Sequence, residues 1–335
     1  MKEIMERLYS GQDLTEKEMT QVAESMFTGN LSDSQIGAFL GCLKQKGVTA
    51  VEMAAFAQVL QKAALQIQNI PHGTMDNCGT GGDYCNSFNI STTTAFVLAG
   101  GGIFMAKHGN RSISSRSGSA DVLEVLGVQL NSSVDRISYF LNEVGIAFLF
   151  APAMHPSMRY VSKVRKELAT PTILNLIGPL TNPIVLENQL MGTFAGHLLR
   201  ETAETLGRIG RKRAIVVHGA HGMDEANLSG ETHYALFDNG VTEHSFGPEE
   251  IGLPYYPLEA IVGGDAQKNA QILLSVLNNE PSPYLDTVLL NAGLGFYTKG
   301  AVSCINEGID KARQVIAYGS AMDKLNQLLR QQEVA

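Results

Sequence analysis

The sequence has few cysteines, no tryptophan and no surplus of positive charge. Its four cysteines in 335 residues (Cys42, Cys78, Cys85 and Cys304) include no CxxC pair, so they predict neither a disulfide framework nor a structural zinc site. The formal net charge is −8, whereas a nucleic-acid-binding protein normally carries a basic face. We therefore expect a reduced, cytoplasmic protein that binds no nucleic acid and builds any anion site locally.

Long apolar runs are also missing. Residues 1–11 mix charged and apolar side chains without a segment of signal-peptide type. The longest apolar stretch, residues 95–106, contains three consecutive glycines and is too short to cross a bilayer. Because 44% of the residues are hydrophobic, the chain can nevertheless bury a large core. We expect a globular protein with no membrane partner.

The first 70 residues predict helices only. Three capping boxes, each a hydroxyl residue followed three positions later by Glu or Gln, mark helix starts at Thr15, Ser32 and Thr49. From about residue 75, short apolar runs alternate with helical stretches, which favours a largely parallel sheet covered by helices. The runs expected as strands are 102–106, 128–130, 146–150, 189–194 and 214–218.

The end of the chain adds a hairpin and more helices. A turn signal at Asp238-Asn239-Gly240 predicts that residues 233–238 and 240–245 pair antiparallel. Residues 266–278, 284–298 and 304–331 are expected to be helical. The predicted fold class is α/β, with a small all-helical N-terminal domain and a large α/β domain around a mainly parallel central sheet. We expect residues 1–70, joined by about 164–186, to form the first domain, and 71–163 with 187–335 the second.

A glycine-rich loop follows the first predicted strand. Gly79-Thr80-Gly81-Gly82-Asp83 lets main-chain N–H groups approach an anion, and the polar run 86–92 then opens a helix whose N-terminus favours negative charge. The loop lacks the Gly-Lys-Ser/Thr ending of a phosphate loop and the glycine spacing of a dinucleotide site. A diphosphate is the expected guest; the alternative is a tight turn with a capped helix.

A second polar cluster follows the next strand. Lys107, His108, Asn110 and Arg111 precede a serine-rich run over residues 112–119, which together indicate an anion-binding surface. The alternative is a solvated loop whose serines, Ser119 among them, cap the helix at residue 120.

Two further motifs complete the candidate site. Asp224-Glu225, in a loop with two glycines after a strand, suits Mg²⁺, although a lone acidic pair is more often a solvated surface. Small apolar residues at 151–156, with Arg165 and Gly178, could form a pocket for a flat aromatic carboxylate, which an arginine fork can pair bidentately. Taken alone, Arg165 would be one charge on a helix face.

In this order the motifs resemble those of the anthranilate phosphoribosyltransferases, which catalyse the second step of tryptophan biosynthesis. The resemblance covers nearly the whole chain. Its motifs are GTGGD…FNIST at 79–92, KHGNR…SSRSGSADVLE at 107–124, FLFAPAMHP at 148–156, VRKEL…NLIGPLTNP at 164–183, VVHG…GMDE at 216–225 and GGDAQKNA at 263–270.

The resemblance implies a fold of the nucleoside phosphorylase and phosphoribosyltransferase type, a homodimer formed through the helical domain, and an active site between the domains. It implies that 5-phosphoribosyl 1-diphosphate (PRPP) is held by Gly79, Thr80, Gly82, Asp83, Asn89, Ser91, Thr92, Lys107 and Ser119. It implies that Mg²⁺, as two ions, is held by Ser91, Asp224 and Glu225. It implies that no residue acts as a general base, and that the anthranilate site is lined by Gly79, His108, Asn110, His155, Arg165 and Gly178.

Two other functions compete with this prediction. A pyrimidine nucleoside phosphorylase would share the architecture but would need no carboxylate-bound Mg²⁺, and a non-catalytic relative could bind nucleic acid. The chain also departs from the family pattern at Tyr84-Cys85, where small residues are expected, and at Ala169, where glycine is expected.

Overall fold

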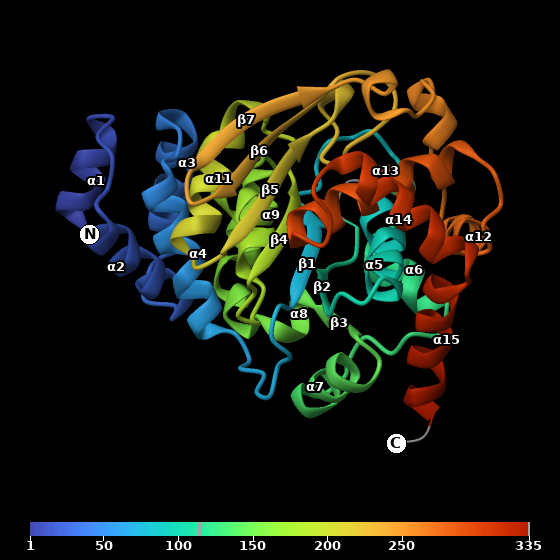
Figure 1. Ribbon diagram of the computed structural model, residues 1–335. Helices are drawn as coiled ribbons and strands as arrows, with labels where there is room; N and C mark the ends of the chain where they lie inside the picture. The colour runs from blue at the N-terminus through green and yellow to red at the C-terminus, as the bar shows by residue number, and fades with distance from the viewer. Residues whose placement is uncertain (113–115, 334–335) are drawn as a thin grey trace.

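The N-terminal part of the chain folds into four helices, as Figure 1 shows. The computed structural model describes residues 1–112 and 116–333. The helices are α1 (Lys2–Tyr9), α2 (Glu16–Phe27), α3 (Asp33–Lys46) and α4 (Ala50–Ala63). The three predicted capping boxes are confirmed, because the hydroxyls of Thr15, Ser32 and Thr49 each accept the backbone N–H three residues on.

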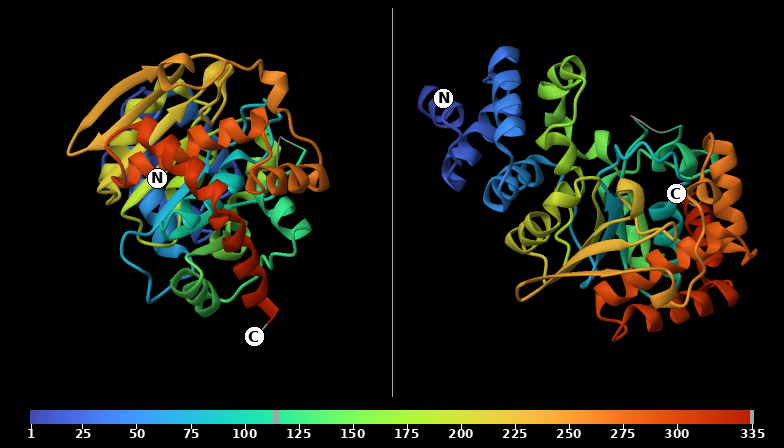
Figure 2. Two further views of the ribbon diagram at one scale, coloured as in Figure 1. Left: turned by 45° about the vertical axis from the view of Figure 1, so that its right-hand side comes forward. Right: turned by 90° about the horizontal axis from the view of Figure 1, so that it is seen from above.

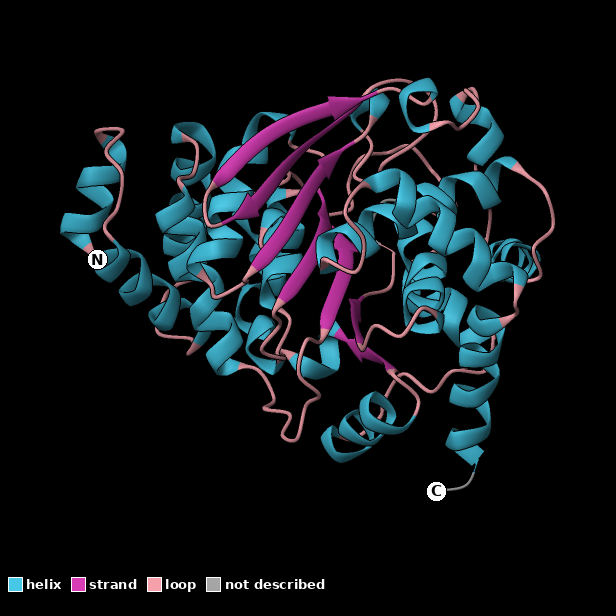
Figure 3. Cartoon of the chain, viewed as in Figure 1, coloured by secondary structure: helices cyan, strands magenta, loops and turns pink. Residues whose placement is uncertain are grey.

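A seven-stranded sheet forms the centre of the molecule (Figure 3). The strands are β1 (Met75–Gly79), β2 (Met105–Gly109), β3 (Ile146–Phe150), β4 (Asn188–Gly192), β5 (Arg213–His218), β6 (Thr232–Asp238) and β7 (Val241–Phe246). Their spatial order is β3-β2-β1-β4-β5-β6-β7. The first five run parallel, and β6 and β7 add the predicted antiparallel hairpin. The mainly parallel sheet is therefore confirmed.

Helices cover both faces of the sheet (Figures 1 and 2). The helices that follow α4 in the chain, not all of which touch the sheet, are α5 (Ile90–Gly100), α6 (Ser119–Val125), α7 (Val134–Glu143), α8 (Ala151–Met154), α9 (Arg159–Leu168), α10 (Ile173–Leu176), α11 (Leu199–Arg208), α12 (Ala266–Leu277), α13 (Pro283–Lys299), α14 (Ile305–Ala317) and α15 (Ser320–Glu333). Strand side chains alternate between two cores: Leu190 packs with the C-terminal helices, and its neighbour Met191 packs with the N-terminal ones.

The chain returns to the N-terminal helices after β3. Val161 and Val164 of α9 and Ile173 and Leu174 of α10 belong to the same buried cluster as α2, α3 and α4. Figure 2 shows α9 standing beside these helices. This cluster continues through α11 onto one face of β4 and β5. The domain limits near residues 70, 164 and 186 remain a proposal.

Four sequence predictions were wrong in detail, of which the smallest is the strand expected at 189–194, since β4 ends at Gly192. Residues 128–130 form no strand, because the Gln129 N–H donates to Gln332 Oε1 of α15 (2.6 Å) instead of to a neighbouring strand. The stretch 304–331 is two helices, because Gly319 takes a positive φ of 75° between α14 and α15. The strand expected at 102–106 begins only at Met105, because Gly102, with φ 90°, still belongs to the turn after α5.

The strand order places loops from distant parts of the chain together. Successive strands run outward from β1 through β2 to β3, and then in the other direction from β4 to β5. Between β1 and β4 the order reverses, and open α/β sheets bind ligands outside the carboxyl ends of the strands at such a point. Within the described residues, no helix is both long and apolar enough to span a membrane.

Candidate active site

The glycine-rich loop leaves β1 at this reversal and is fixed to β4. The Thr80 N–H donates to the Gly192 carbonyl (3.0 Å), and the Phe194 N–H donates to Thr80 Oγ1 (3.2 Å). Gly81 and Gly82 then take φ values of 66° and 80°, which side-chain-bearing residues rarely adopt. The loop is therefore a turn of exposed main chain at the carboxyl edge of the sheet.

This loop touches the acidic loop that follows β5. The Gly81 N–H donates to Asp224 Oδ2 (2.6 Å), and the Asp224 N–H donates to Asp83 Oδ2 (3.4 Å). A Cβ at Gly79 would lie 2.3 Å from Asp224 Oδ2, and one at Gly192 would lie 1.5 Å from the Asp224 carbonyl oxygen. The two loops can therefore meet only because both positions are glycine.

Three carboxylates crowd together where the loops meet. Burial, and then repulsion from Asp83, raise the pKa of Asp224 well above its usual range. Burial, and then repulsion from Asp224, do the same to the pKa of Glu225. Among the described residues, none of the three forms an ion pair. Crowded oxygen donors without a paired cation, whose shared burial disfavours their charged forms, fit a hard divalent cation such as Mg²⁺.

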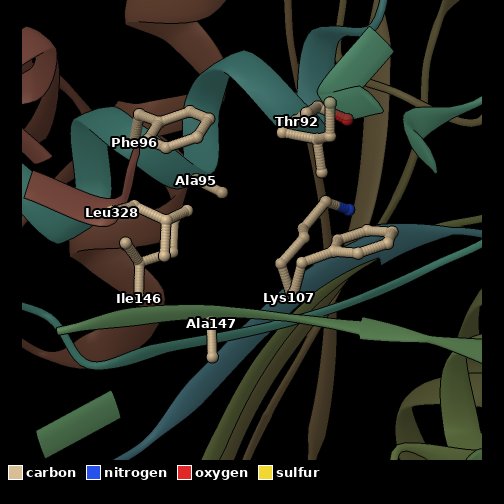
Figure 4. A pocket seen from close by; sticks show the side chains of 9 residues that line it. Thr92, Ala95, Phe96, Lys107, Ile146, Ala147 and Leu328 are labelled. Atoms are coloured by element: carbon tan, nitrogen blue, oxygen red, sulfur yellow. The ribbon is translucent and has the colours of Figure 1, made fainter. Parts of the chain in front are cut away.

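Lys107 reaches the same place from β2. Its buried Nζ donates to the Asn77 carbonyl (3.0 Å) and to Ser91 Oγ (3.2 Å). Burial raises the pKa of Glu225, and the charge of Lys107 and a hydrogen bond from Ser91 offset part of that rise. The Lys107 stem lines a cavity of about 10 Å³ whose other walls are mostly apolar (Figure 4). Because substrate pockets are far larger, this cavity is a packing gap behind the ammonium group.

The N-terminus of α5 faces this cluster without a side-chain cap. Asn89, the N-cap residue, uses its side chain elsewhere: Nδ2 donates to the Ser117 carbonyl (3.3 Å), and Oδ1 accepts from Asn269 Nδ2 (2.8 Å). The buried Thr92 Oγ1 has no hydrogen-bond partner among the described residues. A helix start of this kind favours an anion.

The serine-rich segment after β2 differs from what its composition suggested. Arg111 is paired with Asp121 and Glu124, so its charge is already compensated. Ser119 is the first residue of α6 rather than its cap, and its Oγ donates to the carbonyl of Asn110 (3.2 Å). Asn110 itself is exposed. The expected hydroxyls Ser114 and Ser115 lie outside the described residues.

His108 and His155 form a buried pair at the end of β2 and after α8. Their ring centroids are 5.2 Å apart in an edge-on arrangement. Burial, reinforced by His155, lowers the pKa of His108 to about 3 against a weaker effect of the Gly178 backbone, and burial lowers that of His155 to about 4. Both rings are therefore neutral at pH 7. In the described residues, His108 Nε2 lacks a hydrogen-bond partner, while the backbone of Leu60 opposes only part of the effect of burial on the His155 ring.

Arg165 stands in the last turn of α9 and is half-buried. Burial lowers the pKa of its guanidinium, and no ion pair or hydrogen bond to it occurs within the described residues. Gly178 opens the short turn after α10, where a Cβ would meet nothing within 4 Å. The structure thus brings His108, His155 and Gly178 together, while no observed contact joins Arg165 or Asn110 to them.

Lys107 and His108, adjacent in sequence, point to opposite faces of β2. Lys107 bonds toward α5, whereas the backbone of His108 bonds to Asp76 and its ring packs on His155. The sequence interpretation placed both in a loop after the strand and missed this division. The sequence interpretation also missed four buried polar residues, Asp76, Asn77, Asn182 and Gln189. The one feature of the sequence that could have indicated them is their position within or beside strands whose other residues are buried.

Comparisons with known proteins agree with this geometry. The chain matches the α/β domain of a glycosyl transferase family over residues 72–322 and the helical bundle domain of such a family over 2–64. It is 58% identical to an anthranilate phosphoribosyltransferase of Listeria monocytogenes, over 99% of this chain and 98% of that protein.

Two solved structures extend the comparison. The anthranilate phosphoribosyltransferase of Thermus thermophilus superposes with a TM-score of 0.92 at 39% identity, covering 98% of both chains. That of Saccharomyces cerevisiae, in complex with PRPP and Mg, superposes with a TM-score of 0.89 at 25% identity, covering 99% of this chain and 98% of that one.

Proposed function

The chain belongs to the anthranilate phosphoribosyltransferase family, and from that premise we propose that it transfers the 5-phosphoribosyl group of PRPP to the amine of anthranilate. The products are N-(5-phosphoribosyl)anthranilate and pyrophosphate, and the reaction is the second step of tryptophan synthesis from chorismate. A pyrimidine nucleoside phosphorylase is not favoured, because the described site carries a crowded set of carboxylates suited to Mg²⁺.

The observation that carries this proposal is the contact between the glycine-rich loop and the Asp224 loop. The hydrogen bond from the Gly81 N–H to Asp224 Oδ2 joins the glycine-rich turn to the acidic cluster at the carboxyl edge of the parallel strands. A sugar diphosphate with a divalent cation supplies both the negative and the positive charge that such a site needs. The yeast relative, named as bound to PRPP and Mg, supports this assignment.

We call the loop 79–92, Lys107, Ser119 and residues 224–225 the diphosphate half of the site. Within it, Gly79, Thr80, Gly82, Asp83, Asn89, Ser91, Thr92, Lys107 and Ser119 are proposed to hold PRPP. As the bond from C1 to the diphosphate breaks, negative charge grows on the leaving group. Lys107 stabilises that charge from a fixed position, together with the loop N–H groups that do not already donate to Gly192 or Asp224.

Ser91, Asp224 and Glu225 are proposed to hold Mg²⁺, as two ions, with Asp83 close by. The metal supplies positive charge to the departing pyrophosphate when it is bound. Binding of the cation would also relieve the repulsion among the carboxylates. The diphosphate half is therefore expected to be more stable with its ligands bound.

We call His108, His155, Arg165 and Gly178, with Asn110 and the adjoining Gly79, the aromatic half. Arg165 is proposed to pair with the carboxylate of anthranilate, since its half-buried guanidinium has no partner among the described residues. The neutral imidazoles border a flat ring without adding charge. No general base is required, because an aryl amine has a free lone pair at neutral pH.

Assembly and location are part of the same proposal. We propose a homodimer formed through the N-terminal helices and a cytoplasmic location, as expected for a biosynthetic enzyme of small soluble substrates. Sedimentation of the purified chain at micromolar concentration tests the dimer.

The function is tested by following anthranilate fluorescence with PRPP and Mg²⁺. Loss of fluorescence that requires both additions is the expected result. Phosphorolysis of thymidine or uridine without anthranilate turnover would instead identify a nucleoside phosphorylase, and retention of nucleic acid at low salt without turnover would identify a binding protein.

A further inference from the structure

A chain of buried polar groups lies under the aromatic half. Its centre is Asp76 in β1, whose side chain is fully buried. Oδ1 accepts the N–H groups of Asn77 (2.8 Å) and His108 (3.2 Å), and Oδ2 accepts Asn182 Nδ2 (3.0 Å) and the Cys78 thiol (3.2 Å). Four donors thus fix one carboxylate beside the backbone of His108.

Asn182 connects that carboxylate to the segment that carries Gly178. Besides Asp76, its Nδ2 donates to the Ala106 carbonyl (2.9 Å) on β2, and its Oδ1 accepts the Ile184 N–H (3.0 Å). The far end of the segment from Gly178 to Ile184 is therefore held against the amino-terminal halves of β1 and β2.

Gln189 holds the near end of the same segment. It is the neighbour of Asp76 in the β1–β4 register, and its Nε2 donates to the Pro179 carbonyl (2.7 Å). Its Oε1 accepts Arg211 Nε (2.9 Å). Arg211 is 4% exposed and has no carboxylate ion pair within the described residues.

The grouping of Asp76, Cys78 and His108 could suggest a metal site, since their ligand atoms lie within 4.8 Å of one another. Both oxygens of Asp76, however, already accept two hydrogen bonds each. A metal would have to displace the Asn182 amide. The cluster is better explained by hydrogen bonding alone.

Stability does not account for such a network. Buried polar groups cost desolvation free energy, and well-packed apolar side chains of similar size are often as stabilising or more so. What the hydrogen bonds do supply is a fixed position for the Gly178–Pro179 turn relative to His108.

We propose that Asp76, Asn182, Gln189 and Arg211 are positioning residues that hold the Gly178–Pro179 turn and His108 in the place where the aromatic acid binds. This rests on the proposed function, because it assigns the aromatic acid to that place. The network touches the aromatic half from below and does not contact Asp224, Glu225 or the glycine-rich loop at residues 79–83 through any hydrogen bond described above.

Gln189→Glu is the sharpest test. The glutamate keeps an acceptor for Arg211 and gives that buried cation a counter-charge, but it loses the N–H donor to the Pro179 carbonyl and sets two oxygens against each other. The matched control is Asn188→Asp, one residue earlier on β4. Asn188 accepts Lys299 Nζ (3.0 Å), so the same amide-to-acid change also gains a counter-charge there, away from the turn.

We expect the KM of Gln189→Glu for anthranilate to rise roughly tenfold. A tenfold change corresponds to the free-energy cost of leaving one buried carbonyl without its hydrogen-bond donor. The KM for PRPP should stay close to wild type, and Asn188→Asp should leave both KM values within about twofold; the thermal midpoint of Gln189→Glu should fall by a few degrees, because the unpaired oxygen is buried beside Asp76. If Gln189→Glu does not fold, Arg211→Lys carries the test: it keeps the charge but loses the Nε donor, and should raise the same KM about threefold.

Equal KM values for anthranilate in Gln189→Glu and Asn188→Asp would overturn the proposal. So would an equal rise of the KM values for anthranilate and PRPP, which would mark a merely structural role. If the wild-type protein itself fails to convert anthranilate, the proposed function fails and this proposal falls with it; an active wild type with an unaffected Gln189→Glu refutes the positioning alone.

Discussion

The two halves of the site are unsatisfied in different ways. In the diphosphate half, Asp83, Asp224 and Glu225 crowd like charges around exposed main chain. In the aromatic half, the buried imidazoles are neutral, and His108 Nε2 lacks a hydrogen-bond partner among the described residues. In the diphosphate half the unfavourable free energy comes from repulsion between carboxylates. In the aromatic half it comes from burying polar groups away from water.

Each deficit matches one substrate. A divalent cation bound with a diphosphate relieves the repulsion among the carboxylates. A flat aromatic acid supplies a partner for the half-buried arginine and packs against the neutral imidazoles. Changes in the first half should therefore act on catalysis and on PRPP, and changes in the second on the KM for anthranilate.

The largest effect is expected for Asp224→Asn. It keeps the shape of the side chain and an acceptor for the Gly81 N–H but removes one metal-binding charge, so kcat/KM should fall on the order of a thousandfold. Because repulsion with Asp83 is also removed, the ligand-free variant should melt no lower than wild type. Activity and a melting midpoint that fall together would contradict the charge argument.

A pair of glycine variants comes next and compares a crowded position, which both halves share, with an open position of the aromatic half. Gly79→Ala places a Cβ against Asp224 and should lower kcat/KM about a hundredfold, the cost of a displacement near 1 Å. Gly178→Ala meets no neighbouring atom, so its thermal midpoint should not change while its KM for anthranilate rises. Steady-state kinetics with each substrate varied in turn checks both; a normal KM for anthranilate in Gly178→Ala would remove that residue from the aromatic half.

Arg165→Lys tests the aromatic half by geometry at constant charge. The lysine cannot form the planar two-bond pair with a carboxylate, so the KM for anthranilate should rise about tenfold with the KM for PRPP unchanged. If the KM values of Arg165→Lys match those of wild type, the Arg165 guanidinium does not pair with the anthranilate carboxylate.

The smallest effect concerns the stability of the buried imidazoles against acid. The folded pKa of His155, about 4, lies below its unfolded value near 6.5, so the unfolded chain binds the extra proton and stability falls as the pH drops below about 6.5. At pH 5 this costs about 2 kcal/mol, or about 3 °C in thermal midpoint for a chain of this size. His155→Phe should shrink the difference between the midpoints at pH 7 and pH 5 by that amount. The same pH difference in variant and wild type would show that the ring is not buried neutral.

Local motifs made much of this predictable. The three capping boxes, the hairpin turn and the strands 146–150 and 214–218 follow from short-range chemistry and were confirmed. The residues of both halves were chosen from loops after strands, and the structure brings several of them together.

What the sequence could not show depends on which strands are neighbours. Asp76 meets Asn182 and lies beside Gln189 only because β1 lies between β2 and β4. The departures at Tyr84 and Ala169 also gain meaning only from the backbone, since both residues take positive φ values (58° and 46°), where glycine is favoured.

The most direct measurement is a crystal structure of the protein soaked with PRPP, Mg²⁺ and anthranilate. Metal density within coordination distance of Asp224 and Glu225, diphosphate on the loop 79–92, and the aromatic acid between His108 and Arg165 is the result that two complementary halves require. A diphosphate seated away from residues 79–92 and 224–225, or an aromatic acid bound apart from the two imidazoles, would contradict it.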